Sequence, residues 1–181
     1  MKPRFLTLTA FVLAAALWRV IPHPWNLTPI AAMALFAGAH FSSRTTAYLV
    51  PLAAIAASNL LLGSFYDTVL FVYAGFALSV FIGTQIRARR NAGSIFGAAL
   101  LSSVAFFVIT NVGHWAVSGM YPLTTQGLFS CLTAAVPFFR NSLIGDLAFT
   151  GVFFYGFALL AGRFPALRDP GLAPTLSLRP R

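Results

Sequence analysis

The residues best able to do chemistry lie near the ends of long apolar stretches. Asn111 and His114 are spaced i, i+3, so on a helix they share one face, and Trp115 follows them. Arg19 could bind an anionic ligand group or pair with Asp146. Side chains of this kind, gathered at one level, indicate a pocket for a small polar molecule. The candidate ligand-binding residues are Arg19, His23, Asn26, Asn111, His114, Trp115, Arg140, Asn141 and Asp146.

Each candidate also has a structural interpretation that the sequence leaves open. Arg19 could complement the C-terminal dipole of the first helix, and Asp146 the N-terminal dipole of the last. His23 lies between two prolines in the stretch 22–26, where a rigid turn is favoured over a ligand contact. An isolated histidine such as His114 more often forms an interfacial hydrogen bond than it binds a metal.

Cys131 is the only cysteine of the chain, which excludes an intrachain disulfide and any zinc motif built on paired cysteines. Its thiolate could coordinate a soft metal such as the cobalt of a corrinoid. Packing as a small buried hydrophobe is the favoured alternative. A triad of Cys131, His114 and Asp146 can be drawn, but no spacing fixes its geometry. Recognised catalytic and phosphate-binding motifs are absent from the sequence, so we expect a non-enzymatic protein without a bound cofactor.

The composition points to lipid as the main solvent. Of the 181 residues, 59% are hydrophobic and only 8% are charged, which leaves too little polar surface to cover a water-soluble domain of this size. The net charge of +9 does not indicate nucleic-acid binding, because the basic residues are scattered between apolar runs and form no continuous stripe. We therefore expect an integral membrane protein.

Six apolar stretches predict an all-α, six-helix transmembrane bundle. A spanning helix needs roughly 20 apolar residues, because about 30 Å of hydrocarbon is crossed at about 1.5 Å per residue. The stretch 28–43 is short, which could reflect a thin bilayer, a helix extended by polar ends or a re-entrant segment; we favour a short spanning helix. The predicted spans are 5–21, 28–43, 47–62, 68–86, 94–112 and 143–162.

The distribution of basic residues predicts that both termini are cytoplasmic. Lysine and arginine are enriched in cytoplasmic connections, and with six spans only Arg19 and Arg140 fall on the outer side. A cleaved signal over the first twenty residues is the less favoured alternative, because the chain stays apolar after Ala16. The inner segments hold Lys2, Arg4, Arg44, Arg87, Arg89, Arg90, Arg163, Arg168, Arg179 and Arg181.

Two segments fall outside the predicted spans. The outer segment 113–142 contains an apolar part, 128–139, that is too short to span; we expect a half-helix or lid over the outer mouth, broken at Pro122 and Pro137. The proline- and arginine-rich segment 163–181 is predicted to be a disordered cytoplasmic tail. The expected organisation is a transmembrane domain over 1–162, followed by this tail.

Two motifs resemble a family of uncharacterised bacterial membrane proteins with a presumed transport role. The first runs from Arg19 to Pro29 and continues over 35–39; the second covers 127–131, 137–141 and 145–146. That family in turn is similar to the S components of energy-coupling-factor vitamin transporters, six-helix proteins of the bacterial inner membrane that bind a vitamin near the outer face. In S components an alanine pair on the first helix docks onto a transmembrane coupling subunit, and Ala10 with Ala14 is similar to that pair.

The resemblance implies a substrate-binding membrane subunit for uptake of a vitamin-like micronutrient. Some members of that class bind cobalamin with a cysteine on cobalt, which makes cobalamin the first candidate and assigns Cys131 a role. The implied partners are the lipid bilayer, the small-molecule substrate, and a transmembrane coupling subunit with its ATPases. Two other classes remain open: a membrane-embedded enzyme acting on a lipid or quinone, and an assembly or scaffold protein.

Overall fold

The computed structural model describes residues 2–22, 27–63 and 66–169. Within these ranges the chain is helical, and α3, α5 and α6 are long and apolar enough to cross a membrane. The predicted all-helical, membrane-compatible fold is confirmed at this level. The elements are α1 (Pro3–Trp18), α2 (Ile30–His40), α3 (Arg44–Leu62), α4 (Val69–Gln85), α5 (Ala92–Val117), α6 (Thr125–Arg163) and the 3₁₀ turn η1 (Pro165–Leu167).

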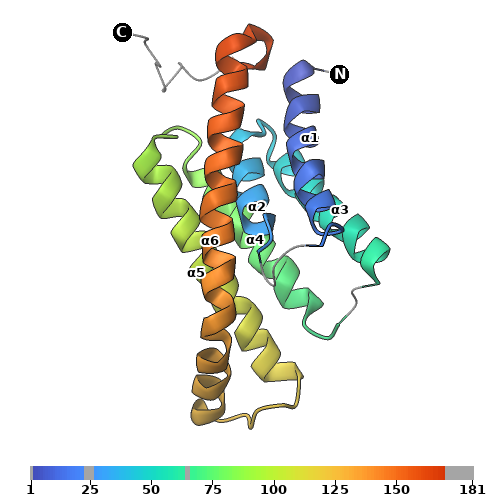
Figure 1. Cartoon of the computed structure of the whole chain (residues 1–181), viewed down its shortest axis with the longest axis vertical. Helices are drawn as coiled ribbons and strands as arrows, with labels where there is room; N and C mark the ends of the chain where they lie inside the picture. Colours follow the sequence, from blue (N-terminus) through green and yellow to red (C-terminus); the bar gives the residue numbers. More distant parts are fainter. Residues whose placement is uncertain (1, 23–26, 64–65, 170–181) are drawn as a thin grey trace.

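Helix α1 begins and α6 ends at the same end of the molecule (Figure 1). The α2–α3 and α4–α5 connections meet there too, because Arg4 and Arg87 both reach the carboxyl end of α2. We call this the basic end, and the opposite end the far end. Helices α1, α3 and α5 run from the basic end toward the far end (Figure 1).

Helix α2 lies at the centre of the bundle and contacts all five other helices. Ten of its eleven residues are buried, which is typical of a helix that is hydrophobic on every side. The ring of Phe36, fully buried, packs against Phe11 of α1 and Phe154 of α6 at centroid distances of 5.5 Å each. Where lipid is the solvent, such packing stabilises the bundle through close van der Waals contact between side chains.

The carboxyl end of α2 is satisfied by three arginines from other elements. The last carbonyl groups of a helix have no intrahelical partner and carry partial negative charge. Arg87 Nε donates to Gly38 O at 2.7 Å, Arg90 to Ala39 O at 3.3 Å, and Arg4 to His40 O at 2.8 Å. Each open carbonyl of α2 beyond Ala37 therefore receives one guanidinium.

Asp169 balances part of this positive charge. Its carboxylate lies 3.1 Å from Arg4 and 3.8 Å from Arg90. Burial lowers the pKa of the Arg90 guanidinium from its ordinary value, and Asp169 acts in the opposite direction. An arginine still stays protonated at neutral pH, so the cluster holds its charge.

The expected disordered tail is wrong for its first seven residues. Leu167 is buried in η1, its carbonyl oxygen accepts a hydrogen bond from Arg4 at 2.7 Å, and Asp169 joins the arginine cluster. Composition missed this because a single apolar residue and a single acid are enough to hold a short segment on a basic surface. Residues 170–181 lie outside the described part of the chain.

The expected break at Pro137 and a separate lid over 113–142 are also wrong. Helix α5 continues to Val117, and α6 runs without interruption from Thr125 to Arg163 with Pro137 inside it. A proline removes one helical hydrogen bond but is tolerated in apolar helices. The polar residue Arg140 does not interrupt the helix, because its side chain is exposed.

The α5–α6 hairpin extends beyond the other helices at the far end (Figure 1). At about 1.5 Å per residue, the 39 residues of α6 measure roughly 58 Å, well beyond the ~30 Å of a hydrocarbon core. By the same measure, the 11 residues of α2 reach only about 16 Å. Helix α2 is shielded by protein on all sides. At this length it would cross a membrane only where the bilayer is thin or together with its flanking residues.

Glycines allow α2 and α4 to cross at close range. A Cβ built on Gly38 would overlap the carbonyl oxygen of Val80 and lie 3.0 Å from the Cα of Gly83, and one on Gly83 would overlap the carbonyl oxygen of Leu35. Small residues at a helix crossing let the backbones approach in this way. Neither neighbour can move aside, because both obstacles are main-chain atoms.

We predict that Gly83→Ala destabilises the protein by about 1–3 kcal/mol, the usual range for overpacking. Gly97→Ala is the matched control, because a Cβ there meets nothing within 4 Å. Thermal unfolding of both variants in the same detergent measures the difference. Equal melting temperatures would show that the crossing is not a tight constraint.

Candidate functional site

The structure separates the predicted ligand-binding residues into three groups. Asp146 lies inside the bundle, Arg19 lies at the end of α1, and Asn111, His114, Trp115 and Cys131 lie along the α5–α6 hairpin. His23 and Asn26 fall outside the described residues. The described candidates are therefore held by three separate sets of contacts.

Asp146 is buried at the amino end of α2. Ser103 Oγ of α5 donates to its Oδ2 at 2.8 Å, and the backbone N–H of Ala32 in the first turn of α2 also donates to it. Because an open helix amino end carries partial positive charge, a carboxylate is stabilised there. Asp146 thus does for the amino end of α2 what the arginines do for its carboxyl end.

The expected role of Asp146 in the first turns of its own helix is wrong. Since α6 begins at Thr125, Asp146 lies in the middle of that helix and cannot meet its amino-terminal dipole. The proposed pair with Arg19 does not form either, because Arg19 is bonded to α3. The carboxylate instead meets the dipole of a helix that is distant in sequence.

A buried pair of hydroxyl groups, from Ser79 and Ser102, joins α4 to α5. Ser102 Oγ donates to Ser79 Oγ at 2.7 Å, and Ser79 Oγ donates to the carbonyl of Gly75 at 3.0 Å. All three hydroxyl-bearing residues that link α4, α5 and α6, namely Ser79, Ser102 and Ser103, are buried. This polar track joins the helices through the interior, where an unpaired hydroxyl would be costly.

Arg19 lies at the C-cap of α1 and is half-buried. Its NH1 donates to the side-chain oxygen of Asn59 at 2.8 Å and to the hydroxyl of Ser58, both at the end of α3. Neither of the ion pairs among the described residues involves it. The guanidinium is therefore fixed in position by neutral groups while keeping its full charge.

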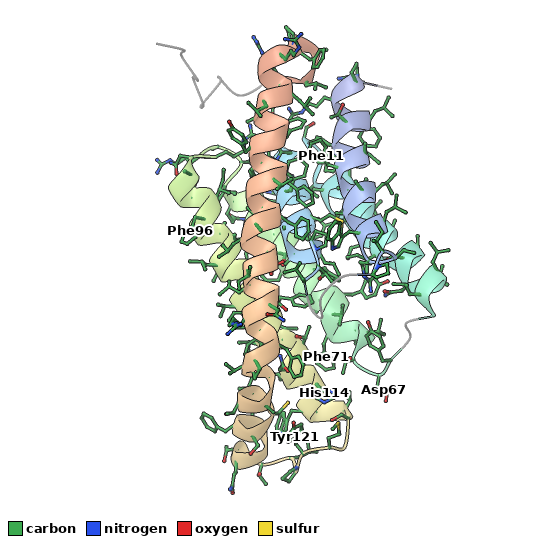
Figure 2. All side chains as sticks on the ribbon, in the orientation of Figure 1. Phe11, Asp67, Phe71, Phe96, His114 and Tyr121 are labelled. Carbon is green, nitrogen blue, oxygen red and sulfur yellow. The ribbon has the colours of Figure 1, made fainter. Side chains whose placement is uncertain are left out.

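The hairpin residues are engaged with one another. Asn111 donates to the carbonyl of Phe107 at 2.8 Å, Trp115 donates to the carbonyl of Pro122 at 3.0 Å, and the ring of His114 lies 6.3 Å from that of Tyr121. The last two residues are labelled in Figure 2, near the tip of the hairpin. The Trp115 and His114 contacts hold α5 against the turn that precedes α6, whereas the Asn111 bond lies within α5.

Cys131 of α6 also contacts α5 in this hairpin. It is 2% exposed, and its Sγ donates to the carbonyl oxygen of Asn111 at 3.5 Å. This environment fits the interpretation of Cys131 as a small buried hydrophobe, since the sulfur faces no open site. The described residues contain no cluster of three or more histidine, cysteine, aspartate or glutamate side chains suited to a metal ion.

The triad of Cys131, His114 and Asp146 is not assembled. In the described part of the chain, the thiol bonds to Asn111, His114 packs on Tyr121, and the carboxylate bonds to Ser103. A nucleophile, its base and an orienting acid must bond in sequence to act together.

The remaining candidates lie on α6. Arg140 is exposed, and Asn141 is half-buried. Sequence reasoning missed Ser58 and Ser103, the partners of Arg19 and Asp146. Each is an isolated polar residue within an apolar stretch, and such residues in a predicted span tend to face the interior or one another.

A family model matches residues 1–167, nearly all of the described chain. The family is described as a family of unknown function, DUF6580. This chain belongs to the DUF6580 family. The match includes every helix and the η1 turn, so the α2 caps and the Arg19 site lie inside the family's shared region. No curated protein and no solved structure matches the chain.

We predict that Asp146→Ala lowers stability by about 1–3 kcal/mol, because Ser103 and the amino end of α2 lose their acceptor. Asp146→Asn should cost less, since its amide oxygen can still accept one bond. Asp67→Ala is the control, because Asp67 is an exposed acid. Thermal unfolding should give Asp146→Ala the lowest melting temperature of the three variants. An unchanged melting temperature in Asp146→Ala would contradict the capping role.

We also predict that Cys131 reacts slowly with a maleimide in the native protein and quickly after denaturation, because the thiol is buried. The chain has a single cysteine, so mass spectrometry reads the modification without ambiguity. Rapid labelling of the folded protein would instead indicate an open thiol and strengthen the cobalt-ligand hypothesis.

Proposed function

We propose that the chain is the substrate-binding membrane subunit of an uptake system for a vitamin-like micronutrient that carries a negatively charged group. The observation that carries this proposal is the Arg19 guanidinium, held at the far end by Ser58 and Asn59 without a carboxylate within ion-pair distance among residues 2–22, 27–63 and 66–169. A fixed cation of this kind is an anchor for a carboxylate or phosphate.

Arginine suits this role better than other cations. Its planar guanidinium has five N–H donors, and bonds to a carboxylate or phosphate oxygen are both charge-assisted and directional. One nitrogen of Arg19 is occupied by the α3 acceptors, so the remaining donors can bind an anion. Because Ser58 and Asn59 already hold the Arg19 side chain in place, ligand binding costs less side-chain entropy.

The proposed topology has six membrane segments and both termini in the cytoplasm of a bacterial inner membrane. The common location of the start of α1 and the end of α6 supports an even number of crossings (Figure 1). The positive charges at the basic end support a cytoplasmic position for that end. In this orientation Arg19 lies on the outer side, where an imported substrate arrives.

The proposed partner is a transmembrane coupling subunit driven by ATPases, and the surface that supports it is the outward face of α1. Ala10 and Ala14 are both exposed, and Leu6, Leu13 and Leu17 are exposed beside them. Small residues one turn apart let a second helix approach closely. In lipid, this apolar stripe needs no polar partner, so it can also stay lipid-facing until the subunit binds.

We expect the purified protein to be stabilised by at least one anionic member of a vitamin panel, with cobalamin tested first. Arg19→Gln should weaken binding of that ligand by on the order of tenfold or more, because a charge-assisted bond is lost. Arg163→Gln is the matched control, since Arg163 is exposed at the basic end. Thermal shift and equilibrium binding measure the effect.

Two results would contradict the proposal. One is the absence of any co-purified small molecule together with no thermal shift across the panel. The other is equal loss of affinity in Arg19→Gln and Arg163→Gln, which would show a general charge effect. If a corrinoid does bind, an absorption spectrum unchanged by Cys131→Ser would exclude the cysteine as its cobalt ligand.

A further inference from the structure

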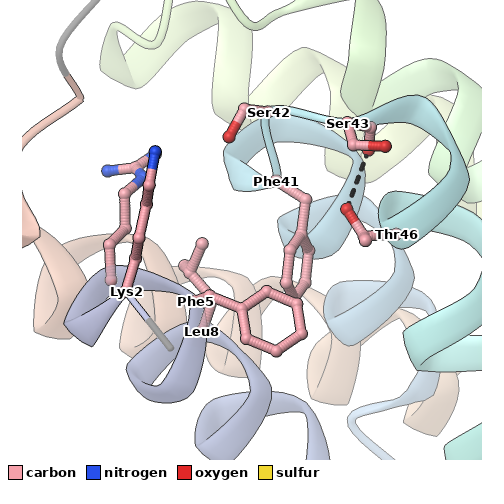
Figure 3. A pocket seen from close by; sticks show the side chains of 8 residues that line it. Lys2, Phe5, Leu8, Phe41, Ser42, Ser43 and Thr46 are labelled. Atoms are coloured by element: carbon pink, nitrogen blue, oxygen red, sulfur yellow. Dashed lines mark hydrogen bonds between the residues drawn. The ribbon is translucent and has the colours of Figure 1, made fainter.

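A groove at the basic end has a composition that suits a phospholipid. It encloses about 320 Å³ between the start of α1 and the α2–α3 connection. Its floor is formed by Phe5, Leu8 and Phe41, and the rings of Phe5 and Phe41 lie 5.8 Å apart, edge to face. In Figure 3 these apolar side chains lie between Lys2 on one side and Thr46 on the other.

The rim of the groove is polar and positively charged. Lys2 and Arg4 line it from α1, and Ser42, Ser43 and Thr46 line it from the opposite side. Arg4 is already bonded to the carbonyl groups of α2 and η1 and to Asp169. Lys2 is exposed and takes part in neither ion pair of the described chain, so its charge is available.

The hydroxyl side of the rim adds further donors. Ser42 and Ser43 are exposed, and the Ser43 side chain does not cap the amino end of α3 that follows it. The Thr46 hydroxyl turns back to the carbonyl of Ser43 at 3.0 Å, which fixes this edge of the groove (Figure 3). A phosphate placed between Lys2 and Ser42 would meet a cation on one side and a hydroxyl donor on the other (Figure 3).

An apolar surface continues from the groove along α3. Leu49 lies three residues after Thr46, on the same face of the helix, and is 60% exposed. Ala53 and Leu60 continue this exposed face toward the far end. An acyl chain that leaves the groove would therefore run along a helix face that is already suited to lipid.

We propose that this groove binds one anionic phospholipid, with the phosphate between Lys2 and Ser42 and an acyl chain over Phe5, Phe41 and the outward face of α3. A free phosphate would use the rim but not the apolar floor. A protein partner would have to reach a groove that opens at the membrane boundary, where lipid is the abundant ligand. In the proposed topology the lipid belongs to the cytoplasmic leaflet, whose anionic lipids are attracted to basic segments.

The experiment titrates the full-length protein, in a neutral detergent, with phosphatidylglycerol or with phosphatidylcholine of the same acyl chains, and counts bound lipids by native mass spectrometry. We expect one phosphatidylglycerol to bind on the order of tenfold more tightly than phosphatidylcholine. Lys2→Gln should weaken it about fivefold, because one basic side chain near the phosphate is lost. Arg89→Gln is the matched control, as Arg89 is exposed at the same end but does not line the groove.

A second variant tests the space in the groove without changing its charge. Thr46→Trp keeps the net charge but fills the groove, so it should abolish tight binding while leaving the lipid-free melting temperature close to that of the wild type. Equal affinity for the two lipids, or equal losses in Lys2→Gln and Arg89→Gln, would overturn the proposal. Competition by millimolar inorganic phosphate would overturn it in favour of a free-anion site.

Discussion

The structure depends on the charges that meet the two ends of α2. A buried helix leaves open N–H groups at one end and open carbonyl groups at the other, and in an apolar interior water cannot satisfy them. Asp146 accepts from the amino end, and Arg4, Arg87 and Arg90 donate to the carboxyl end. The sign of each group matches the helix dipole, so one short helix accounts for four of the ionisable residues of the bundle.

This arrangement explains which elements must pack together. The caps come from α1, from the α4–α5 connection and from α6, and each therefore has to reach α2 for the central helix to be stable there. The glycine crossing of α2 and α4 brings the α4–α5 connection close enough for Arg87 to reach Gly38. Asp169 then joins the end of the chain to the same cluster. Packing and capping thus specify the same neighbours.

Hydrophobic stretches were enough to predict six helices and their approximate positions, because each stretch is apolar and bounded by polar or glycine-rich residues. They could not predict that α6 starts at Thr125, because Arg140 and Pro137 look like interruptions when their exposure is unknown. The candidate site was predicted less well. Sequence identified Arg19 and Asp146 as unusual, but their partners Ser58 and Ser103 are set by helix packing, which a single sequence does not specify.

The caps also change how the basic residues are interpreted. The bias of positive charge toward the basic end predicts an orientation in the membrane, yet Arg4, Arg87 and Arg90 are also required at that end to cap α2. Orientation and folding thus favour the same placement for separate physical reasons. Among the other basic residues, Lys2 at the basic end lines a groove and Arg19 at the far end is held by neutral side chains, and no described carboxylate lies within ion-pair distance of either. Because an uncompensated cation beside an apolar segment is costly, the two proposed anionic ligands would each stabilise the protein at one of these positions.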